Sequence, residues 1–498
     1  MKMTQTTSAR CWFARVCACG VASAAGLLVA CQAAADQPRP EVPKPAPSVS
    51  SPDVSSPLMS APVVTAPVVL PGSALIIAQA VKPKANPATQ PVAVATSVKI
   101  RVATFNLEDV RTEDLVSGNQ PRLRSLASII QRVRPNVILL NEIAYDTPGV
   151  PGFNRLDYSG VGVAEKPRLG LNGQRFADKY LAVAQAEGLL PIRYRAFMEP
   201  SNTGVHSGFD LDNDGVITPT YPEPPPSTKE GDPGEQTAEG RLYGNDCWGF
   251  GTFPGQYAMA LLVDERLVLD AENARTFQLL PWDYMSGNFM PSKADGTPWY
   301  DAEETKTMPM SSKSHWDVPV RMPNGSVVHM LCSHPTPPGF DAVEMRNKKR
   351  NHDEIRFWAD YLDNAAYVID DSRVQGGLAK GAHFVILGDL NADPDEGSSY
   401  KDPIDNLLVS HSRINGGFVP TSDVAIDKLD ADDTAMFRLR VDYVLPSKTL
   451  EVEGGAVERA APPKAYKMIQ RGQENVAAWP SDHFLVWLDV VVPAPVLP

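Results

Sequence analysis

The sequence contains few cysteines and no metal-binding pattern built on them. Six cysteines occur in 498 residues, and four of them lie within the first 31 positions. The remaining two, Cys247 and Cys332, predict either one disulfide in an oxidising compartment or two buried thiols. The chain also shows no zinc-ligand spacing, no phosphate-cradling glycine loop, no G-x-S-x-G nucleophile turn and no internal repeat. These absences exclude zinc-cluster, P-loop and α/β-hydrolase chemistry.

Basic residues are also in short supply. The chain has 46 Lys and Arg against 59 Asp and Glu, for a net charge of −13. Residues 1–30 hold three basic residues and no acid, so the chain without them is near −16. Proteins that bind nucleic acid non-specifically usually carry a basic surface. The acidic balance therefore disfavours a tight duplex binder, although a nuclease whose charge lies away from its groove stays open.

The apolar run at Val21–Ala30 is too short to span a membrane and follows three basic residues. This is the pattern of a secretory signal peptide over residues 1–30. The run ends in "LVAC", which resembles the bacterial lipoprotein signal, whose cysteine (here Cys31) becomes the lipidated N-terminus. We therefore expect a lipid-anchored protein of the cell envelope, and Gln32 favours the outer membrane. The alternative is an ordinary signal peptide cut near "AAAD", which would give a secreted protein.

The rest of the chain divides into a tether and one catalytic domain. Residues 31–97 are rich in proline, serine, alanine and valine, which predicts a semi-extended tether. Residues 98–493 alternate strand and helix patterns, with an insertion at about 200–255, and predict an α/β domain with mixed sheets. Strands are expected at 98–107, 136–143, 257–263, 318–322, 326–334, 383–389, 440–445 and 483–492, and helices at 122–133, 176–187 and 351–363.

Polar side chains follow the predicted strands at the points where the strands end. In "FVILGDLNADPDEG" (384–397), four apolar residues run directly into a series of acids. Each such residue alone is more often a turn or cap residue. Several at strand ends can converge on one edge of a layered sheet. The residues at strand ends are Asn106, Glu142, His334, Asp389 and Asn391, while Asp442 lies inside a predicted strand and the pair Asp482 and His483 opens the last one.

Six motifs carry a resemblance to a known family. "FNL", "LLNEI", "SHPTPP", "LGDLNADP", "VDYVL" and "SDHFLV" occur in the order and approximate spacing of the endonuclease/exonuclease/phosphatase superfamily. The chain thus resembles pancreatic-type deoxyribonuclease and neutral sphingomyelinase. The resemblance implies an α/β fold, a four-layer α/β sandwich with two packed mixed β-sheets, over residues 98–493.

The resemblance also implies a role for each motif residue. Glu142 resembles the main ligand of a hard divalent cation, Mg²⁺ or Mn²⁺ with Ca²⁺ as an alternative, and Asn106 and Asp482 lie near it. Asp389 and Asn391 resemble the pair that orients the attacking water and contacts the phosphoryl oxygens. The remaining roles follow in the same way: His483 as general base or electrophilic partner, Asp442 as the acid that orients it, and His334 facing the phosphate.

Further residues near these motifs have less specific roles. Gln256 and Tyr257 open a strand and could help to bind phosphate. His315 should lie at the same end of the sheet as His334, either in the pocket or as a surface-loop histidine. Lys313 is expected to be a solvated charge.

An acidic loop lies within the insertion. "FDLDNDGVI" contains Asp210, Asp212 and Asp214 followed by Gly215, which is the start of a calcium loop. Tyr221 stands where an EF-hand needs glutamate, so the loop is not an EF-hand. A calcium-braced insertion and an acidic turn both stay open.

The sequence therefore predicts a metal-dependent phosphoesterase that hydrolyses phosphodiester bonds with activated water. The alternatives are a phosphomonoesterase of the same fold and a binding lipoprotein that has lost the chemistry. The partners implied are a phosphoester substrate, nucleic acid as one candidate substrate, and a membrane reached through the N-terminal lipid. No protein partner is implied.

We expect Asp389→Ala to lower turnover by more than about a hundredfold, because the substitution removes the group that orients the attacking water. Folding should be unchanged. Steady-state kinetics with circular dichroism on the same sample measures both, and full activity in the variant would remove Asp389 from the mechanism.

Overall fold

The computed structural model describes residues 96–153, 169–471 and 473–495. The predicted signal peptide, Cys31 and nearly all of the predicted tether lie outside these residues, so they stay predictions. Of the helices that the described residues form, none combines the length and apolar character needed to cross a membrane.

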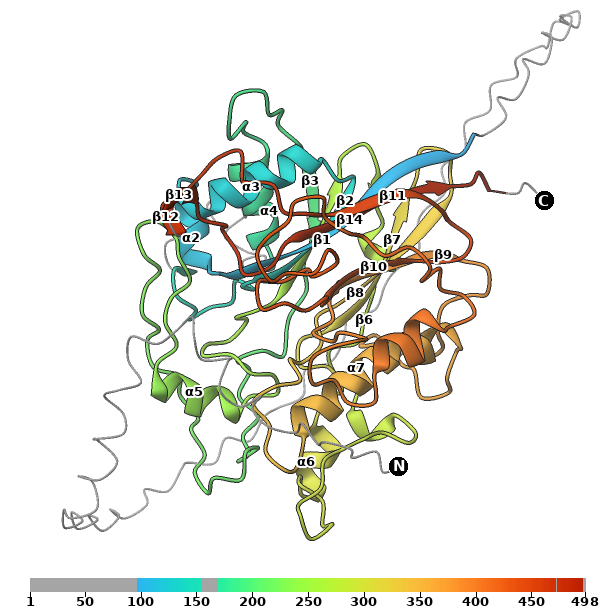
Figure 1. The fold of residues 1–498 in the computed structure, drawn as a ribbon. Coiled ribbons are helices and arrows are strands. Elements are labelled where there is room, and N and C mark those ends of the chain that lie inside the picture. The colour runs from blue at the N-terminus through green and yellow to red at the C-terminus, as the bar shows by residue number, and fades with distance from the viewer. Residues whose placement is uncertain (1–95, 154–168, 472, 496–498) are drawn as a thin grey trace, which may run out of the picture. The chain divides into compact units, whose positions relative to one another are not determined.

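Two six-stranded sheets form the body of the domain (Figure 1). In the first sheet, β1 pairs in parallel with β2 and antiparallel with β14. Its strands in spatial order are β11 (Glu451–Glu458), β14 (Leu485–Val492), β1 (Val98–Val110), β2 (Val137–Ile143), β4 (Met259–Asp264) and β3 (Tyr194–Phe197).

The second sheet is also mixed. In it β8 pairs in parallel with β9 and antiparallel with β7, across a turn at 322–325. Its strands in order are β10 (Asp442–Pro446), β9 (His383–Asp389), β8 (Val327–Ser333), β7 (His315–Arg321) and β5 (Val268–Leu269), with β6 (Arg275–Thr276) also on β7. A separate hairpin joins β12 (Met468–Arg471) to β13 (Glu474–Ala477).

Apolar side chains alternate between the two faces of the strands. Those on the inner faces pack the sheets against each other, and those on the outer faces pack against helices. Val102 and Leu387 belong to one buried cluster between the sheets. Phe105 lies on the opposite face of β1 from Val102 and packs with the helices on the outer face of the first sheet. Ile386 does the same on the second sheet, against Trp358 of its covering helix. The order helix, sheet, sheet, helix confirms the predicted four-layer sandwich.

The helices of the two outer layers differ in length. The first sheet is covered by α3 (Pro121–Val133), α4 (Asn172–Phe176) and the π-helix η2 (Ala177–Leu181), and the second by α7 (Arg346–Leu362) and η5 (Ile404–Val409). Shorter elements are α2 (Thr112–Val116), α5 (Ala238–Asn245), η3 (Ala271–Asn273), η4 (Trp282–Tyr284) and α6 (Ala302–Thr307).

Some of the predicted elements have different bounds in the structure. The helix expected at 176–187 ends at Leu181, and Gln185 instead donates its backbone N–H to the side chain of Gln131. The strand expected at 318–322 begins earlier, at His315. Cys247 and Cys332 are both free and buried, so the structure shows thiols and not a disulfide.

Gly388 permits the close approach of β9 to the end of β8. Its φ is +147°, and a Cβ atom at this position would lie 1.9 Å from the carbonyl oxygen of Ser333. We expect Gly388→Ala to lower the free energy of unfolding by more than about 2 kcal/mol, because the backbone itself must shift. Chemical denaturation measures this change.

Gly417→Ala is the matched control, because its added Cβ would meet only the Asn415 side chain at 3.9 Å. Equal stability of the two variants would show that the backbone at Gly388 adapts without cost.

Candidate active site

The site is built where the inward-facing positions of the strands continue past the apolar core. Along β9, Val385 and Leu387 face the other sheet, and alternation places Asp389 on the same side. Cys332 and His334 follow the same rule at the end of β8. The predicted polar residues at the strand ends therefore close one edge of the space between the sheets.

Several residues at this edge have left-handed backbone conformations, in which a side chain leaves its strand's alternation. Glu108, Asp109, Glu142, Tyr257 and Asn391 have φ between +52° and +60°. Such conformations are uncommon outside glycine and gather at functional sites. Alternation would point Glu142 away from Asn141, toward the helices, but its hydrogen bonds direct the carboxylate to the site.

Asp389 is the centre of the hydrogen-bond network. Its Oδ2 accepts from Asn106 Nδ2 at 3.0 Å and lies 3.4 Å from His334 Nε2 and 3.7 Å from His483 Nε2. Its Oδ1 accepts from the backbone N–H of Asn391 at 2.9 Å. Burial alone would raise the pKa of Asp389, but His483 and His334 lower it below the usual range. Asp389 is therefore ionised at neutral pH.

His483 and Asp442 form a buried pair beside Asp389. His483 Nδ1 donates to Asp442 Oδ2 at 2.8 Å, which leaves Nε2 facing Asp389. Burial opposes the charged imidazole, but the carboxylates of Asp442, Asp389 and Asp482 raise its pKa well above the ordinary value. The imidazole is thus held as a cation in a fixed orientation, as the predicted role of Asp442 requires.

Three acids lie on the other side of Asn106. Glu142 Oε1 accepts from Asn106 Nδ2 at 3.1 Å, and Oε2 accepts from the Asp109 N–H at 3.0 Å. Burial and the charge of Asp482 raise the pKa of Glu142 to about 7. The same two causes raise the pKa of Glu108 to about 8. Carboxylates that destabilise one another in this way fit a hard divalent cation, which would remove the repulsion and use their oxygens as ligands.

Glu108 was missed from the sequence. It stands two residues after Asn106, a spacing that in an ordinary strand puts both side chains on one face. That spacing was the available signal.

His334 and Lys313 line the same space as Asp389. His334 is 2% exposed, and its Nδ1 has no hydrogen-bond partner among the described residues. Burial and then Lys313 lower the pKa of His334 to about 4, so it is neutral. The expectation that Lys313 is solvated was wrong, because its exposure is only 5%.

The other predicted pocket residues are engaged in the structure. Gln256 Nε2 donates to both carboxylate oxygens of Asp109, and Tyr257 Oη accepts from Gln236 Nε2 at 2.7 Å. Gln256 therefore holds Asp109 in place. His315 is fully buried, and its ring nitrogens form hydrogen bonds with the Ser311 hydroxyl and the Glu354 carbonyl oxygen. It therefore stabilises the segment that carries Lys313.

The acidic loop of the insertion is arranged differently from the sequence expectation. Carboxylate oxygens of Asp210, Asp212 and Asp246 lie within 4.8 Å of one another. The third member of this cluster is therefore Asp246, which lies 32 residues after Asp214 in the chain, and not Asp214 itself. Asp214 instead accepts from the Val216 N–H at 2.7 Å. A hydrogen bond of this kind also occurs in an acidic turn without an ion, so calcium at this loop stays a prediction.

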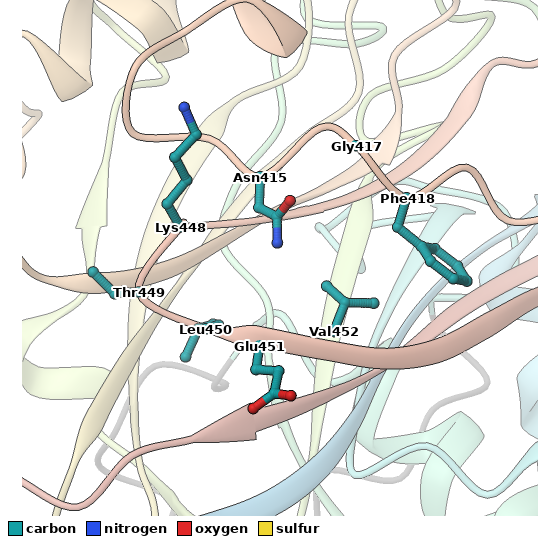
Figure 2. Close-up of a pocket in the computed structure, with 8 residues that line it drawn as sticks. All are labelled: Asn415, Gly417, Phe418, Lys448, Thr449, Leu450, Glu451 and Val452. Carbon is teal, nitrogen blue, oxygen red and sulfur yellow. The ribbon is translucent and has the colours of Figure 1, made fainter.

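Two cavities help to locate the site. The larger, about 670 Å³, is an open depression at the end of β10 away from Asp442 (Figure 2). It offers one lysine and one glutamate and no histidine, so it lacks the residues for this chemistry. The smaller, about 360 Å³, adjoins the site through Glu108, Ser481 and Asp482, and its lining also includes Tyr466 and Met436.

Comparison with known proteins agrees with this geometry. A model of the Endonuclease/Exonuclease/phosphatase family matches residues 103–483. Among curated proteins, none matches the sequence.

Several solved structures are distant likenesses. An endonuclease/exonuclease/phosphatase from Beutenbergia cavernae is 16% identical, with 80% of this chain and 73% of that chain covered and a TM-score of 0.40. The human Nocturnin catalytic domain with bound sulfate anion is 12% identical, with 79% and 93% covered and a TM-score of 0.36. A family protein from Bacteroides thetaiotaomicron is 12% identical, with 80% and 96% covered and a TM-score of 0.35.

The repulsion among the acids at Glu142 predicts stabilisation by metal. We expect millimolar Mn²⁺ or Mg²⁺ to raise the unfolding temperature, since a ligand at a hundred times its dissociation constant adds about 2.7 kcal/mol. Glu142→Gln should lose most of this shift, because it removes a ligand and one of the repelling charges. Differential scanning fluorimetry with and without metal measures the shift.

Glu265→Gln, at an exposed surface position, is the control and should respond to metal as the unmodified protein does. A full metal shift in Glu142→Gln would place the cation elsewhere.

Proposed function

The chain belongs to the endonuclease/exonuclease/phosphatase family, and from this premise we propose that it is a divalent-metal-dependent phosphoesterase that hydrolyses phosphodiester bonds with an activated water. One observation carries the proposal: a buried His483–Asp442 pair faces the ionised Asp389, and Asn106 links Asp389 to the acids around Glu142. Phosphoester hydrolysis needs a base for water, a charged group on the phosphoryl oxygens and a cation; Asp389 and His483 would supply the first two, and the acids around Glu142 would hold the third.

The pKa values of Asp389 and His483 are shifted in opposite directions, which gives the two groups different roles. Asp389 is held as an anion and can accept a proton from the attacking water. His483 is held as a cation, so it acts on a phosphoryl or leaving oxygen as electrophile and proton donor, not as the base. Groups whose environments push their pKa values apart take the acid and base roles of a reaction. The Asn391 backbone N–H fixes the Asp389 carboxylate for this purpose.

The cation would be held by Glu142, Glu108 and Asp482, which are hard oxygen donors. When bound it would neutralise phosphoryl oxygen charge. Asn106 keeps Glu142 and Asp389 at a fixed separation, since its amide nitrogen donates to both. The identity of the ion, Mg²⁺ or Mn²⁺, is part of the proposal.

The cavity beside Asp482 favours a phosphodiester over a small phosphomonoester. Its volume of about 360 Å³ and its wall of Tyr466, Met436 and Trp479 would accept an organic group carried by the phosphate. We place the enzyme outside the cytoplasm on a lipid anchor at Cys31, which the leader pattern supports, and nucleic acid is one candidate substrate.

We expect chelator-sensitive hydrolysis of bis-p-nitrophenyl phosphate by the purified protein with Mg²⁺ or Mn²⁺. His483→Ala should lower kcat by about 10²–10⁴-fold, the range of a positioned general acid or base. His411→Ala is the control, because that imidazole contacts Asp363 on the outer helix layer. Activity that survives chelation, or a His483→Ala variant as fast as the control, would contradict the mechanism.

Parallel assays separate the substrate classes. Faster cleavage of p-nitrophenyl phosphate would identify a monoesterase, and nicking of plasmid DNA would identify a nuclease. Binding of phosphoesters without hydrolysis of any of them would favour the non-catalytic alternative.

A further inference from the structure

Lys313 is a buried lysine for which the described residues provide no ion-pair partner. It precedes β7, and its side chain is only 5% exposed. The ammonium group makes one hydrogen bond among the described residues, and this bond is long, 3.4 Å from Nζ to the carbonyl oxygen of Pro335. Among the described residues, no carboxylate oxygen lies within 4.0 Å of this ammonium. A buried charge with two unused N–H donors carries a large desolvation cost that a bound anion would offset.

The ammonium is located at the candidate active site. Pro335 O, which accepts from Lys313, also accepts from Asn391 Nδ2 at 3.2 Å. Two donors from different strand ends thus meet at one carbonyl, next to His334. Burial lowers the pKa of Lys313, while the carboxylates of Glu354, Glu142 and Asp389 oppose this shift, in agreement with this position.

Glu354 fixes the segment that carries Lys313. Its Oε1 accepts from the Ser312 N–H at 2.6 Å and from Ser312 Oγ at 2.9 Å. Its Oε2 accepts from the Thr336 N–H at 2.6 Å. One buried carboxylate therefore joins the residue before Lys313 to the residue after Pro335.

The insertion at about 200–255 holds the same segment from the other side. The Asn202 backbone N–H donates to Lys313 O at 2.9 Å, and Asn202 Nδ2 donates to Ser311 O at 2.8 Å. Gly249 lies against Ser312, where a Cβ would come 1.8 Å from the carbonyl oxygen. The insertion thereby sets the backbone from which the lysine reaches the site.

We propose that Lys313 binds a non-bridging oxygen of the substrate's phosphoryl group, beside Asn391, and that Asn202 of the insertion is its positioning residue. The proposal rests on the proposed function for the identity of the anion. A lysine on a rigid segment can donate to the phosphoryl group as its charge changes in the transition state. The insertion would then make a direct contribution to activity, in addition to shaping the cleft.

The test compares Lys313→Met and Lys313→Arg with Lys380→Met, a change at an exposed lysine. We expect Lys313→Met to lower kcat/KM for bis-p-nitrophenyl phosphate by about a hundredfold, the effect of losing one such donor. Its affinity for inorganic phosphate, measured by calorimetry with Mn²⁺ present, should fall at least tenfold. Its unfolding temperature should equal or exceed that of the unmodified protein, since a buried unpaired charge has been removed.

Two results would overturn the proposal. One is a Lys313→Met variant with unchanged kcat/KM and unchanged phosphate affinity. The other is a loss of activity that comes with a large fall in unfolding temperature and is not restored in part by Lys313→Arg, which would make the lysine structural. If the unmodified protein hydrolyses nothing but Lys313→Met still loses phosphate affinity, the lysine assignment holds and the proposed function fails.

A double-mutant cycle tests the positioning role of Asn202. Asn202→Ala should reduce kcat more than it changes KM in the unmodified background. In the Lys313→Met background the same substitution should have little further effect, because two residues that act through one contact are not additive. Equal effects in both backgrounds would separate the insertion from the lysine.

Discussion

The hydrogen bonds made by one buried amide hold the two sheets at the spacing that the site needs. Asn106 Nδ2 donates to Asp389 on the opposite sheet at 3.0 Å and to Glu142 on the neighbouring strand at 3.1 Å. A second link joins the sheets where the Asp389 N–H meets Asn141 Oδ1 at 3.3 Å. Asp389, for which we propose contact with the attacking water, and the carboxylates that suit a cation are thus held at a fixed separation by Asn106, and this separation does not depend on a loop.

Electrostatics then assigns a different state to each group. The site lies in an acidic chain, and its edge gathers more carboxylates than cations. His483 and Lys313 lie on the side of Asp389. His483 and Arg122 offset only part of the repulsion among the acids at Glu142 and Glu108, since the pKa values of both glutamates stay raised. A divalent cation at the acids around Glu142, with a phosphoryl anion between that cation and the pair His483 and Lys313, would complete this charge distribution.

Much of the fold could be predicted because apolar patterns along a strand are a local property. Alternation in 98–107 and continuous apolar runs in 136–143 and 383–389 located central strands of both sheets, and the helix at 122–133 appeared within one residue of its bounds. The edge strands β3 and β11 were missed, because their residues pack on only one side and their patterns are weak. The helix expected at 176–187 failed because tertiary hydrogen bonds to Gln131 replaced its last turns.

The sequence by itself determined which residues could act, since Asp389 and His334 follow apolar strands, and Asp442 opens one, in a phase that points them between the sheets. Only the tertiary structure decided how Glu142, Glu108 and Lys313 take part. For the first two, left-handed backbone conformations redirect the side chains, and no local pattern encodes such a turn. For Lys313, burial arises from contacts with residues more than a hundred positions earlier in the chain, and a charge becomes functional only when distant segments remove it from water.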